Sequence, residues 1–285
     1  MATMQDLATD QTNYWCPGCG NFGIITAVKR AIVQLGLGRE DVTAVTGIGC
    51  HGKMTNYLNV NGFHVIHGRV LPVATAIKLA NLEQTVIGFS GDGDSFGIGM
   101  GHFPHAARRN PDITLIVHDN LIYGLTTGQT SPTTRRGHMT KSTPRGAFEE
   151  AVNPIAAALA SNASFVARGY VGEIQQLTDL FVQALSWEGF AMVDVLQPCV
   201  SWNRINTYQF YKERVYKLEE AGHDPSDISQ AYERSLEWTE RIPIGVFYKR
   251  ERPVYSDNFP FLEGEPLNRR RIDDADITGL MKEFA

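Results

Sequence analysis

Thr85-Val86-Ile87-Gly88-Phe89-Ser90 leads directly into Gly91-Asp92-Gly93-Asp94, and this stretch decides the fold. An apolar run of this length, closed by glycine and aspartate, is typical of a buried strand followed by a tight turn. A helical pattern then extends over residues 96 to 109 and ends at Asn110-Pro111, because proline cannot continue a helix. The stretch therefore predicts a strand, a turn and a helix in succession, which is the repeating unit of α/β proteins.

The same succession recurs on both sides of that stretch. Apolar runs closed by small or polar residues predict further strands at 42–45, 113–117 and 190–196. Helical patterns cover residues 24–35 and 71–80. This alternation predicts an α/β fold with a mainly parallel sheet and helices on both faces.

Four polar or thiol side chains follow directly after the predicted strands. They are Cys50, Asp92, Asn120 and Cys199. In sheets of this kind ligands bind just beyond the carboxyl ends of the strands. We therefore expect these four residues to lie along one edge of the sheet, and the chemistry of the protein to be there.

Composition narrows the class of protein. The chain has 285 residues, 43% of them hydrophobic, which is enough for the sizeable core of a globular protein. Its net charge of -5 argues against a general nucleic-acid binder, because affinity for the phosphate backbone depends on concentrated Lys and Arg. No apolar run approaches the roughly 20 residues of a membrane span, and the first residues lack the pattern of a signal peptide, so we expect a cytoplasmic protein without a membrane segment.

Charge divides the chain into two parts. Residues 206–285 carry 12 Lys and Arg and 16 Asp and Glu, about half of all the charged residues. We therefore predict a site-bearing domain at 1–205 and a charged, helical and extended C-terminal arm at 206–285. Residues 211–216 have a helical pattern, and residues 242–266 have the prolines of an extended segment. The arm is either a solvated appendage or a contact with a partner subunit, and the second is favoured because five aromatic side chains need burial: Phe247, Tyr248, Tyr255, Phe259 and Phe261.

The four cysteines suit one metal-containing site. Cys16-Pro17-Gly18-Cys19 places two thiols on one tight turn, and Cys50 and Cys199 are far apart in the sequence but at strand ends. A redox dithiol is a weaker interpretation of the pair, because no strand precedes it. Zinc remains an alternative, since zinc and Fe-S clusters share all-cysteine ligation. One close pair with two distant single cysteines favours a cluster.

The Gly91-Asp92-Gly93-Asp94 turn has the chemistry of a diphosphate site. Glycines and the start of a helix allow backbone amides to face an anionic phosphate. Asp92 offers a carboxylate oxygen and Asn120 an amide oxygen, which are ligands that Mg²⁺ accepts together with phosphate. By itself the turn could be an ordinary one with a capping aspartate. The position of Asn120 at the end of the next strand favours the magnesium site.

These residues resemble the β subunits of 2-oxoacid:ferredoxin oxidoreductases. The Gly-Asp-Gly turn with Asn120 resembles the thiamine diphosphate motif. The other segments that resemble the family are Trp15-Cys16-Pro17-Gly18-Cys19-Gly20, Gly47-Ile48-Gly49-Cys50, His67-Gly68-Arg69 with Leu71-Pro72-Val73-Ala74-Thr75, Ile122-Tyr123-Gly124-Leu125-Thr126, and Gln129-Thr130-Ser131-Pro132-Thr133. The likeness covers residues 14 to about 250, and it implies the diphosphate-binding domain of the thiamine diphosphate fold.

The resemblance also implies a set of site residues. Magnesium would be bound by Asp92, Asn120 and the Ile122 carbonyl. One [4Fe-4S] cluster would be bound by Cys16, Cys19, Cys50 and Cys199. Thiamine diphosphate would contact Ile48, Gly49, Cys50, His51, His67, Gly93, Asp94, Gly124 and Leu125. His67 and Lys53 would have catalytic roles. Lys53 would bind the carboxylate of the substrate.

The activity implied by the resemblance is the oxidative decarboxylation of a 2-oxoacid. Electrons would pass singly through the cluster to ferredoxin, and coenzyme A would take the acyl group. The chain lacks the strand-borne glutamate that activates thiamine, so an α subunit would supply it in an α₂β₂ assembly. The segment at His67 favours 2-oxoglutarate over pyruvate or a broad range of 2-oxoacids. A non-redox thiamine diphosphate decarboxylase subunit and a zinc-stabilised binding protein are the remaining alternatives.

Overall fold

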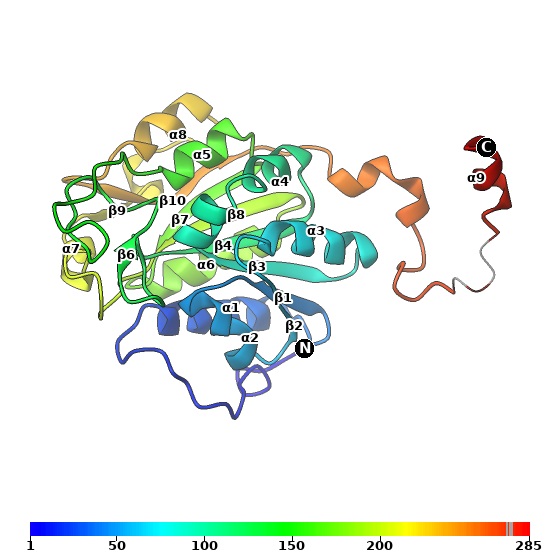
Figure 1. The fold of residues 1–285 in the computed structure, drawn as a ribbon, viewed down its shortest axis with the longest axis horizontal. Helices are drawn as coiled ribbons and strands as arrows, with labels where there is room; N and C mark the ends of the chain where they lie inside the picture. Colours follow the sequence, from blue (N-terminus) through cyan, green and yellow to red (C-terminus); the bar gives the residue numbers. More distant parts are fainter. Residues whose placement is uncertain (272, 274–275) are drawn as a thin grey trace.

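A computed structural model describes residues 1–271, 273 and 276–285, and its centre is an eight-stranded sheet (Figure 1). The strand order is β2-β1-β3-β4-β8-β7-β10-β9, and neighbours pair in parallel except β7 and β10, which are antiparallel. The strands of this sheet are β1 (Val42–Thr46), β2 (Asn61–His64), β3 (Thr85–Gly91), β4 (Ile113–Asp119), β7 (Phe165–Tyr170), β8 (Phe190–Leu196), β9 (Val215–Lys217) and β10 (Ile242–Lys249). A separate two-stranded hairpin joins β5 (Ile122–Tyr123) to β6 (Gln129–Thr130).

Helices cover both faces of the sheet, so the predicted α/β architecture is confirmed. One face carries α1 (Asn21–Gln34) and α6 (Ile174–Leu185), which pack against each other. The other face carries α3 (Val70–Ala80), α4 (Phe103–Arg109), α5 (Pro154–Ala160) and α8 (Ile228–Ser235) (Figure 1). The short helices are α2 (Met54–Tyr57), α7 (Tyr208–Lys212) and α9 (Thr278–Glu283).

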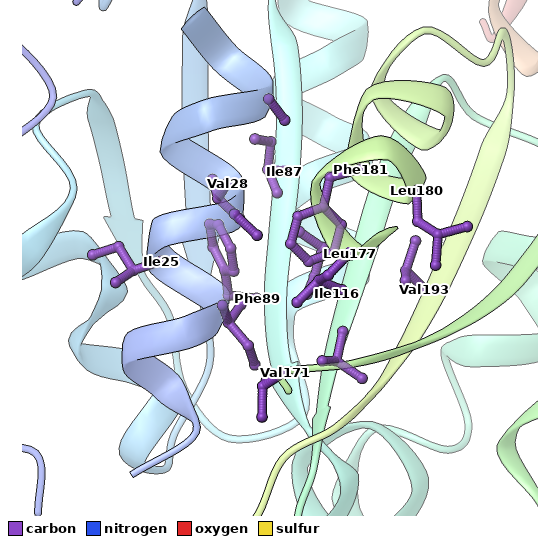
Figure 2. Close-up of a cluster of buried hydrophobic side chains, with 14 of the residues drawn as sticks. Ile25, Val28, Ile87, Phe89, Ile116, Val171, Leu177, Leu180, Phe181 and Val193 are labelled. Carbon is purple, nitrogen blue, oxygen red and sulfur yellow. The ribbon is translucent and has the colours of Figure 1, made fainter. Parts of the chain in front are cut away.

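The core on the first face shows why these residues form these elements (Figure 2). Leu177, Leu180 and Phe181 lie on one side of α6 because their spacing matches the helical period. They pack with Ile87 and Phe89, which alternate along β3 and therefore point to the same face. Burying each such side chain contributes about 1.5–3 kcal/mol of transfer free energy.

The helix expected over residues 96–109 is interrupted. The chain instead forms a short π-helical turn, η2 (Asp94–Ile98), and α4 begins only at Phe103. Gly97 lies within η2, and Gly99 and Gly101 fall in the gap before α4. A side chain on Gly99 would begin 2.5 Å from the carbonyl oxygen of Asp94, so this break allows a backbone approach that a continuous helix of larger residues would prevent.

The C-terminal part differs most from expectation. The helix expected over 211–216 is confirmed only at Tyr211 and Lys212, because α7 ends at Lys212 and Val215–Lys217 form β9. Residues 242–249 are not an extended tail but form β10 in the main sheet, where Phe247 and Tyr248 are buried in the chain's own core. The backbone of β10 pairs antiparallel with β7, and the apolar and aromatic side chains of β10 suit a strand that packs on a core.

Beyond β10 the chain does extend away from the sheet (Figure 1). Tyr255 and Phe259 are half-buried, and Phe261 is exposed. These three aromatic residues stay candidates for a partner contact, and the boundary at residue 205 stays a prediction. Among the residues that the structure describes, no helix combines the length and apolar character that crossing a membrane requires.

Candidate thiamine diphosphate and cysteine site

One pocket lies where the central parallel strands end. Segments after β1, β3, β4 and β8 meet there, because the register pairs Gly91 of β3 with His118 of β4, and Asp119 of β4 with Leu196 of β8. The expected edge with Cys50, Asp92 and Asn120 is therefore confirmed, with Cys199 next to it. The residues that line the pocket are Ile48, Gly49, Cys50, His51, His67, Gly91, Asp92, Gly93, Asp94, His118, Asn120, Ile122, Tyr123, Gly124, Leu125, Thr126 and Gln197.

Asp92 is a buried carboxylate at the centre of this pocket. Its Oδ2 accepts hydrogen bonds from the hydroxyls of Ser131 (2.5 Å) and Thr133 (2.8 Å). Burial raises the pKa of Asp92 to about 6, although these hydroxyls lower it. Within the described residues no Lys, Arg or His forms an ion pair with it. A buried carboxylate held by neutral donors fits a bound cation.

The other two proposed oxygen ligands lie beside it. Asn120 follows β4, and its side-chain oxygen accepts a hydrogen bond from Ile122 N at 3.1 Å. Its amide nitrogen donates to Gln197 Oε1 at 3.0 Å, which orients the oxygen. Ile122 opens the hairpin and is buried. Asp92, Asn120 and Ile122 therefore all line the same pocket.

Ser131 and Thr133 were not predicted as site residues. Thr133 Oγ1 lies 2.8 Å from Asp92 and 2.9 Å from Asp119 Oδ1, so it connects the ends of two strands. Residues 131–134 turn back under the pocket, where Thr134 also donates to the Leu121 carbonyl. The signals in the sequence were the hydroxyl-rich composition of this segment and its likeness to the family, but neither pointed to Asp92, because the contact spans about 40 residues.

Position 93 must be glycine because the ring of Tyr123 lies too close to leave room for a side chain there. A side chain there would begin 2.1 Å from Cε1 of Tyr123, and the Tyr123 hydroxyl donates to the Gly93 carbonyl at 3.3 Å. The tyrosine ring therefore lies against the glycine turn. This contact joins the hairpin to the turn after β3 and closes one side of the pocket.

The Asp94 side chain is engaged with the protein itself. Oδ1 accepts from Gly68 N at 2.7 Å and lies 2.6 Å from His67 Nδ1, while Oδ2 accepts from the Ser90 hydroxyl at 2.8 Å. A side chain on Gly47 would begin 1.8 Å from Asp94 Oδ2. Asp94 thus connects the loops that carry Ile48 and Gly68 to the end of β3.

The four cysteines gather next to this pocket. A side chain on Gly124 would begin 3.5 Å from Cys199 Sγ and 3.9 Å from Cys50 Sγ. Cys19 is buried on the turn that begins at the exposed Cys16, and Gln197 Nε2 donates to its sulfur at 3.4 Å. In the described part of the chain, however, no three His, Cys, Asp or Glu side chains lie as close as ligands of one metal ion.

Burial controls the charge of these thiols. It raises the pKa of Cys19 to about 12 and that of Cys50 to about 11, and the neighbouring thiols of Cys199 and Cys16 add to both shifts. The thiols of Cys19 and Cys50 are therefore neutral at physiological pH when no metal is bound. Iron binding would replace their protons, which couples metal uptake to proton release.

Comparison with known proteins assigns the family. The family model "Thiamine pyrophosphate enzyme, C-terminal TPP binding domain" matches residues 47–195, and the model for the C-terminal part of the pyruvate ferredoxin oxidoreductase beta subunit matches residues 199–264. A 2-oxoacid:ferredoxin oxidoreductase β subunit of a Sulfolobus species is 49% identical over 262 residues, covering 87% of this chain and 86% of that relative. The chain belongs to this family of β subunits.

Two further relatives agree with this family. A 2-oxoglutarate synthase subunit of Archaeoglobus fulgidus is 38% identical and covers 82% of this β subunit, which covers 84% of it. Among solved structures, 2-oxoglutarate:ferredoxin oxidoreductase from Magnetococcus marinus, with 2-oxoglutarate, coenzyme A and succinyl-CoA bound, superposes with a TM-score of 0.90 at 35% identity. That match covers all of this chain and 96% of the other.

In this β subunit, two buried polar residues on the first face of the sheet were missed by sequence reasoning. His118 Nδ1 lies 2.8 Å from Asn21 Oδ1, and in the described structure His118 Nε2 and Asn21 Nδ2 have no hydrogen-bond partner. Burial holds the pKa of His118 well below its ordinary value, so the ring is neutral. Both residues sit within apolar-looking segments, which gave no sign of a polar pair.

The two predicted catalytic residues of the β subunit are placed differently. His67 lines the pocket with a side chain about one-third exposed. Lys53 lies outside the pocket wall, with its Nζ 5.6 Å from the centre of the Tyr14 ring. His51 lines the pocket, and its Nε2 accepts from Gly91 N at 3.2 Å. The catalytic parts of Lys53 and His67 stay predictions.

Proposed function

We propose that this β subunit belongs to an enzyme that converts 2-oxoglutarate and coenzyme A to succinyl-CoA and CO₂, with ferredoxin as the electron acceptor. The observation that carries the proposal is the buried Asp92 carboxylate, held only by neutral donors, beside four gathered thiols. The reaction runs as reductive carboxylation when ferredoxin is sufficiently reduced. The relatives named for 2-oxoglutarate support that substrate.

The cofactor residues follow from the pocket. Mg²⁺ would be held by Asp92, Asn120 and the Ile122 carbonyl, and the diphosphate by backbone amides at Gly93, Asp94, Gly124 and Leu125. Bound thiamine diphosphate supplies the electron sink that allows CO₂ to leave. The chain itself orients these ligands: Ser131 and Thr133 hold Asp92, and Asp94 fastens the loops that carry Ile48 and Gly68.

One [4Fe-4S] cluster would be held by Cys16, Cys19, Cys50 and Cys199. The sulfurs of a cluster's ligands are separated by the cluster itself, whereas a zinc ion draws four sulfurs around one point. One close pair of cysteines with two distant single cysteines favours the cluster over zinc. The position of Gly124 supports a short distance for electron transfer from thiamine diphosphate to the cluster. Gly124 lines the thiamine pocket and also lies next to Cys50 and Cys199.

The partner is an α subunit that completes the thiamine pocket in an α₂β₂ assembly. The β subunit family itself implies the α subunit. Ile48 and Leu125 line the pocket yet are exposed, and Ile66 and Ile98 are exposed on the neighbouring loops. Exposed apolar side chains at a pocket mouth fit a covering subunit. The C-terminal arm, with Phe261 exposed, would add to this contact, and the cytoplasm stays the expected compartment.

The test uses the αβ complex purified without oxygen. Reduction of ferredoxin with 2-oxoglutarate, pyruvate and branched 2-oxoacids, each with coenzyme A, should be fastest with 2-oxoglutarate. Iron and acid-labile sulfide analysis should detect four of each per β subunit, as one [4Fe-4S] cluster requires. A faster reaction with pyruvate would replace the substrate assignment. A colourless complex that contains zinc would overturn the oxidoreductase mechanism for this site.

A further inference from the structure

Gln197 contacts a proposed ligand of each of the two metal-containing groups. It follows β8 directly, is 1% exposed and lies on the wall of the thiamine pocket. Its Oε1 accepts a hydrogen bond from Asn120 Nδ2 at 3.0 Å, and its Nε2 donates to Cys19 Sγ at 3.4 Å. One buried carboxamide therefore connects a proposed magnesium ligand to a proposed cluster ligand.

Backbone groups fix the direction of both amides in this chain of hydrogen bonds. The Pro198 carbonyl can only accept, and it lies 3.1 Å from Gln197 Nε2, so the nitrogen of the carboxamide faces the cysteine turn. The Ile122 amide can only donate, and it lies 3.1 Å from Asn120 Oδ1, so Nδ2 of Asn120 faces Gln197. Asn120 therefore donates to Gln197, and Gln197 donates to Cys19.

The neighbouring backbone also holds Gln197 in place. Its own amide donates to the Asp119 carbonyl at 2.9 Å, next to the pairing of β8 with β4. On the other side, Gly20 N donates to the Pro198 carbonyl at 3.3 Å. A side chain on Gly20 would begin 2.7 Å from Gln197 Cγ, so this glycine leaves room for the glutamine against the cysteine turn. Strand ends and cysteine turn thus fix the carboxamide together.

The two hydrogen bonds of the carboxamide act on different properties. N–H donors to ligand sulfurs favour the more negative, reduced form of a cluster and so raise its reduction potential. Burial raises the pKa of the Cys19 thiol to about 12, so negative charge on this sulfur is costly without such donors. A hydrogen bond to the amide of Asn120 keeps its oxygen turned toward a bound metal ion.

We propose that Gln197 is a shared positioning residue, which orients Asn120 for Mg²⁺ and raises the reduction potential of the cluster bound through Cys19. This role rests on the proposed function, because it requires both groups at those residues. Gln197 acts only through its two neighbours. Loss of its carboxamide should therefore change cofactor affinity and cluster potential in the same variant, although the two properties belong to different sites.

The experiment compares Gln197→Met with Gln176→Met in the αβ complex purified without oxygen. Both changes replace a carboxamide by a side chain of similar length, but the Gln176 carboxamide on α6 has no hydrogen-bond partner in the described structure. A titration with dithionite, followed by electron paramagnetic resonance, measures the cluster potential. Calorimetry after removal of the cofactor measures the Kd for thiamine diphosphate with Mg²⁺.

Both readouts should change in Gln197→Met. At a given potential the ratio of reduced to oxidised cluster should fall about tenfold, which for a one-electron couple is a shift of about 59 mV to lower potential. The Kd for the cofactor should rise about tenfold. Gln176→Met should leave both values unchanged.

Gly20→Ala is a second variant that keeps the carboxamide but displaces it. Gly20 has a φ of -59°, which alanine adopts without strain, so the main effect is the contact with Gln197 Cγ. Potential and affinity should change in the same directions as in Gln197→Met, by smaller factors. This variant decides the test if Gln197→Met does not retain its iron.

The possible results separate this role from the proposed function. Unchanged potential and Kd in the deciding variant would overturn the role of Gln197 and leave the proposed function intact. A change in only one of the two values would overturn the shared role and assign Gln197 to that site alone. Neither readout depends on which 2-oxoacid is oxidised. A wild-type complex without iron would contradict the proposed function itself, and the role at Cys19 with it.

Discussion

Buried polar residues at the two ends of the parallel sheet differ in whether the protein itself compensates for their burial. At the amino ends, Asn110 is fully buried between α4 and β4. Its side chain accepts hydrogen bonds from the Ser164 hydroxyl and Phe190 N, and donates to the carbonyls of Arg252 and Pro253. At the carboxyl ends, Asp92 is buried with a raised pKa and without a cationic side chain in the described structure. At the amino ends, the hydrogen bonds of Asn110 stabilise the fold. At the carboxyl ends, the buried charge of Asp92 costs stability but leaves a carboxylate available to bind a cation.

The largest expected effect is at Asp92. Asp92→Asn should weaken binding of thiamine diphosphate with Mg²⁺ by about a hundredfold or more, because it removes the charged ligand. The cofactor-free protein should unfold at the same or a higher temperature, since a costly buried carboxylate is removed. Cofactor affinity is measured by calorimetry and unfolding by circular dichroism.

Asp112→Asn is the matched control for that change. Asp112 precedes β4 at the amino end and forms an ion pair with Lys78 at 2.6 Å, so its loss should leave cofactor affinity unchanged. The cluster colour should persist in both variants. Wild-type cofactor affinity in Asp92→Asn would remove Asp92 from the metal site.

At the opposite end, Asn110→Ala should lower the free energy of unfolding by about 2–4 kcal/mol, because it leaves buried partners without hydrogen bonds and places alanine at a positive φ of 60°. Asn162→Ala, at a similar φ of 63° but exposed, should cost clearly less. Denaturant unfolding measures both. Equal losses would mean that backbone strain, not the buried hydrogen bonds, explains Asn110.

A smaller effect is expected at Thr133, which joins Asp92 to Asp119. Thr133→Val keeps the shape but removes the hydroxyl, and it should weaken Mg²⁺ and thiamine diphosphate binding about tenfold. Thr133→Ser should restore most of the affinity, because it returns the hydroxyl. If the valine variant bound the cofactor as tightly as wild type, the hydroxyl would not position Asp92.

The smallest effect is expected at Tyr123. Its hydroxyl makes a long hydrogen bond of 3.3 Å to the Gly93 carbonyl, whereas its ring supplies the packing against the turn. Tyr123→Phe should therefore change cofactor affinity by no more than about tenfold, as loss of one ordinary hydrogen bond would. Tyr123→Ala should have a much larger effect. Equal effects of the two substitutions would assign the role to the hydroxyl rather than the ring.

The sequence predicted the pocket edge because strand ends can be recognised locally. Asp92 and Asn120 follow apolar runs, and parallel strands place their carboxyl ends together. Ser131 could not be predicted as a partner of Asp92 in this way, because their contact depends on how a loop folds back. The break before α4 was missed because helical periodicity contains no information on backbone contacts. Gly99 lies close to the backbone of Asp94 and Gly68, which only the folded chain shows.

By itself the sequence determined the α/β class, the strand-end positions of Cys50 and Cys199 and the magnesium ligand candidates, since these follow from period, residue chemistry and strand ends. Only the tertiary structure decided that Phe247 lies in the chain's own core, that Lys53 lies outside the pocket wall, and that Cys16 is exposed while Cys19 is buried. The physical reason is that a pattern records which face a residue prefers, whereas burial and contact depend on which distant segment packs against it.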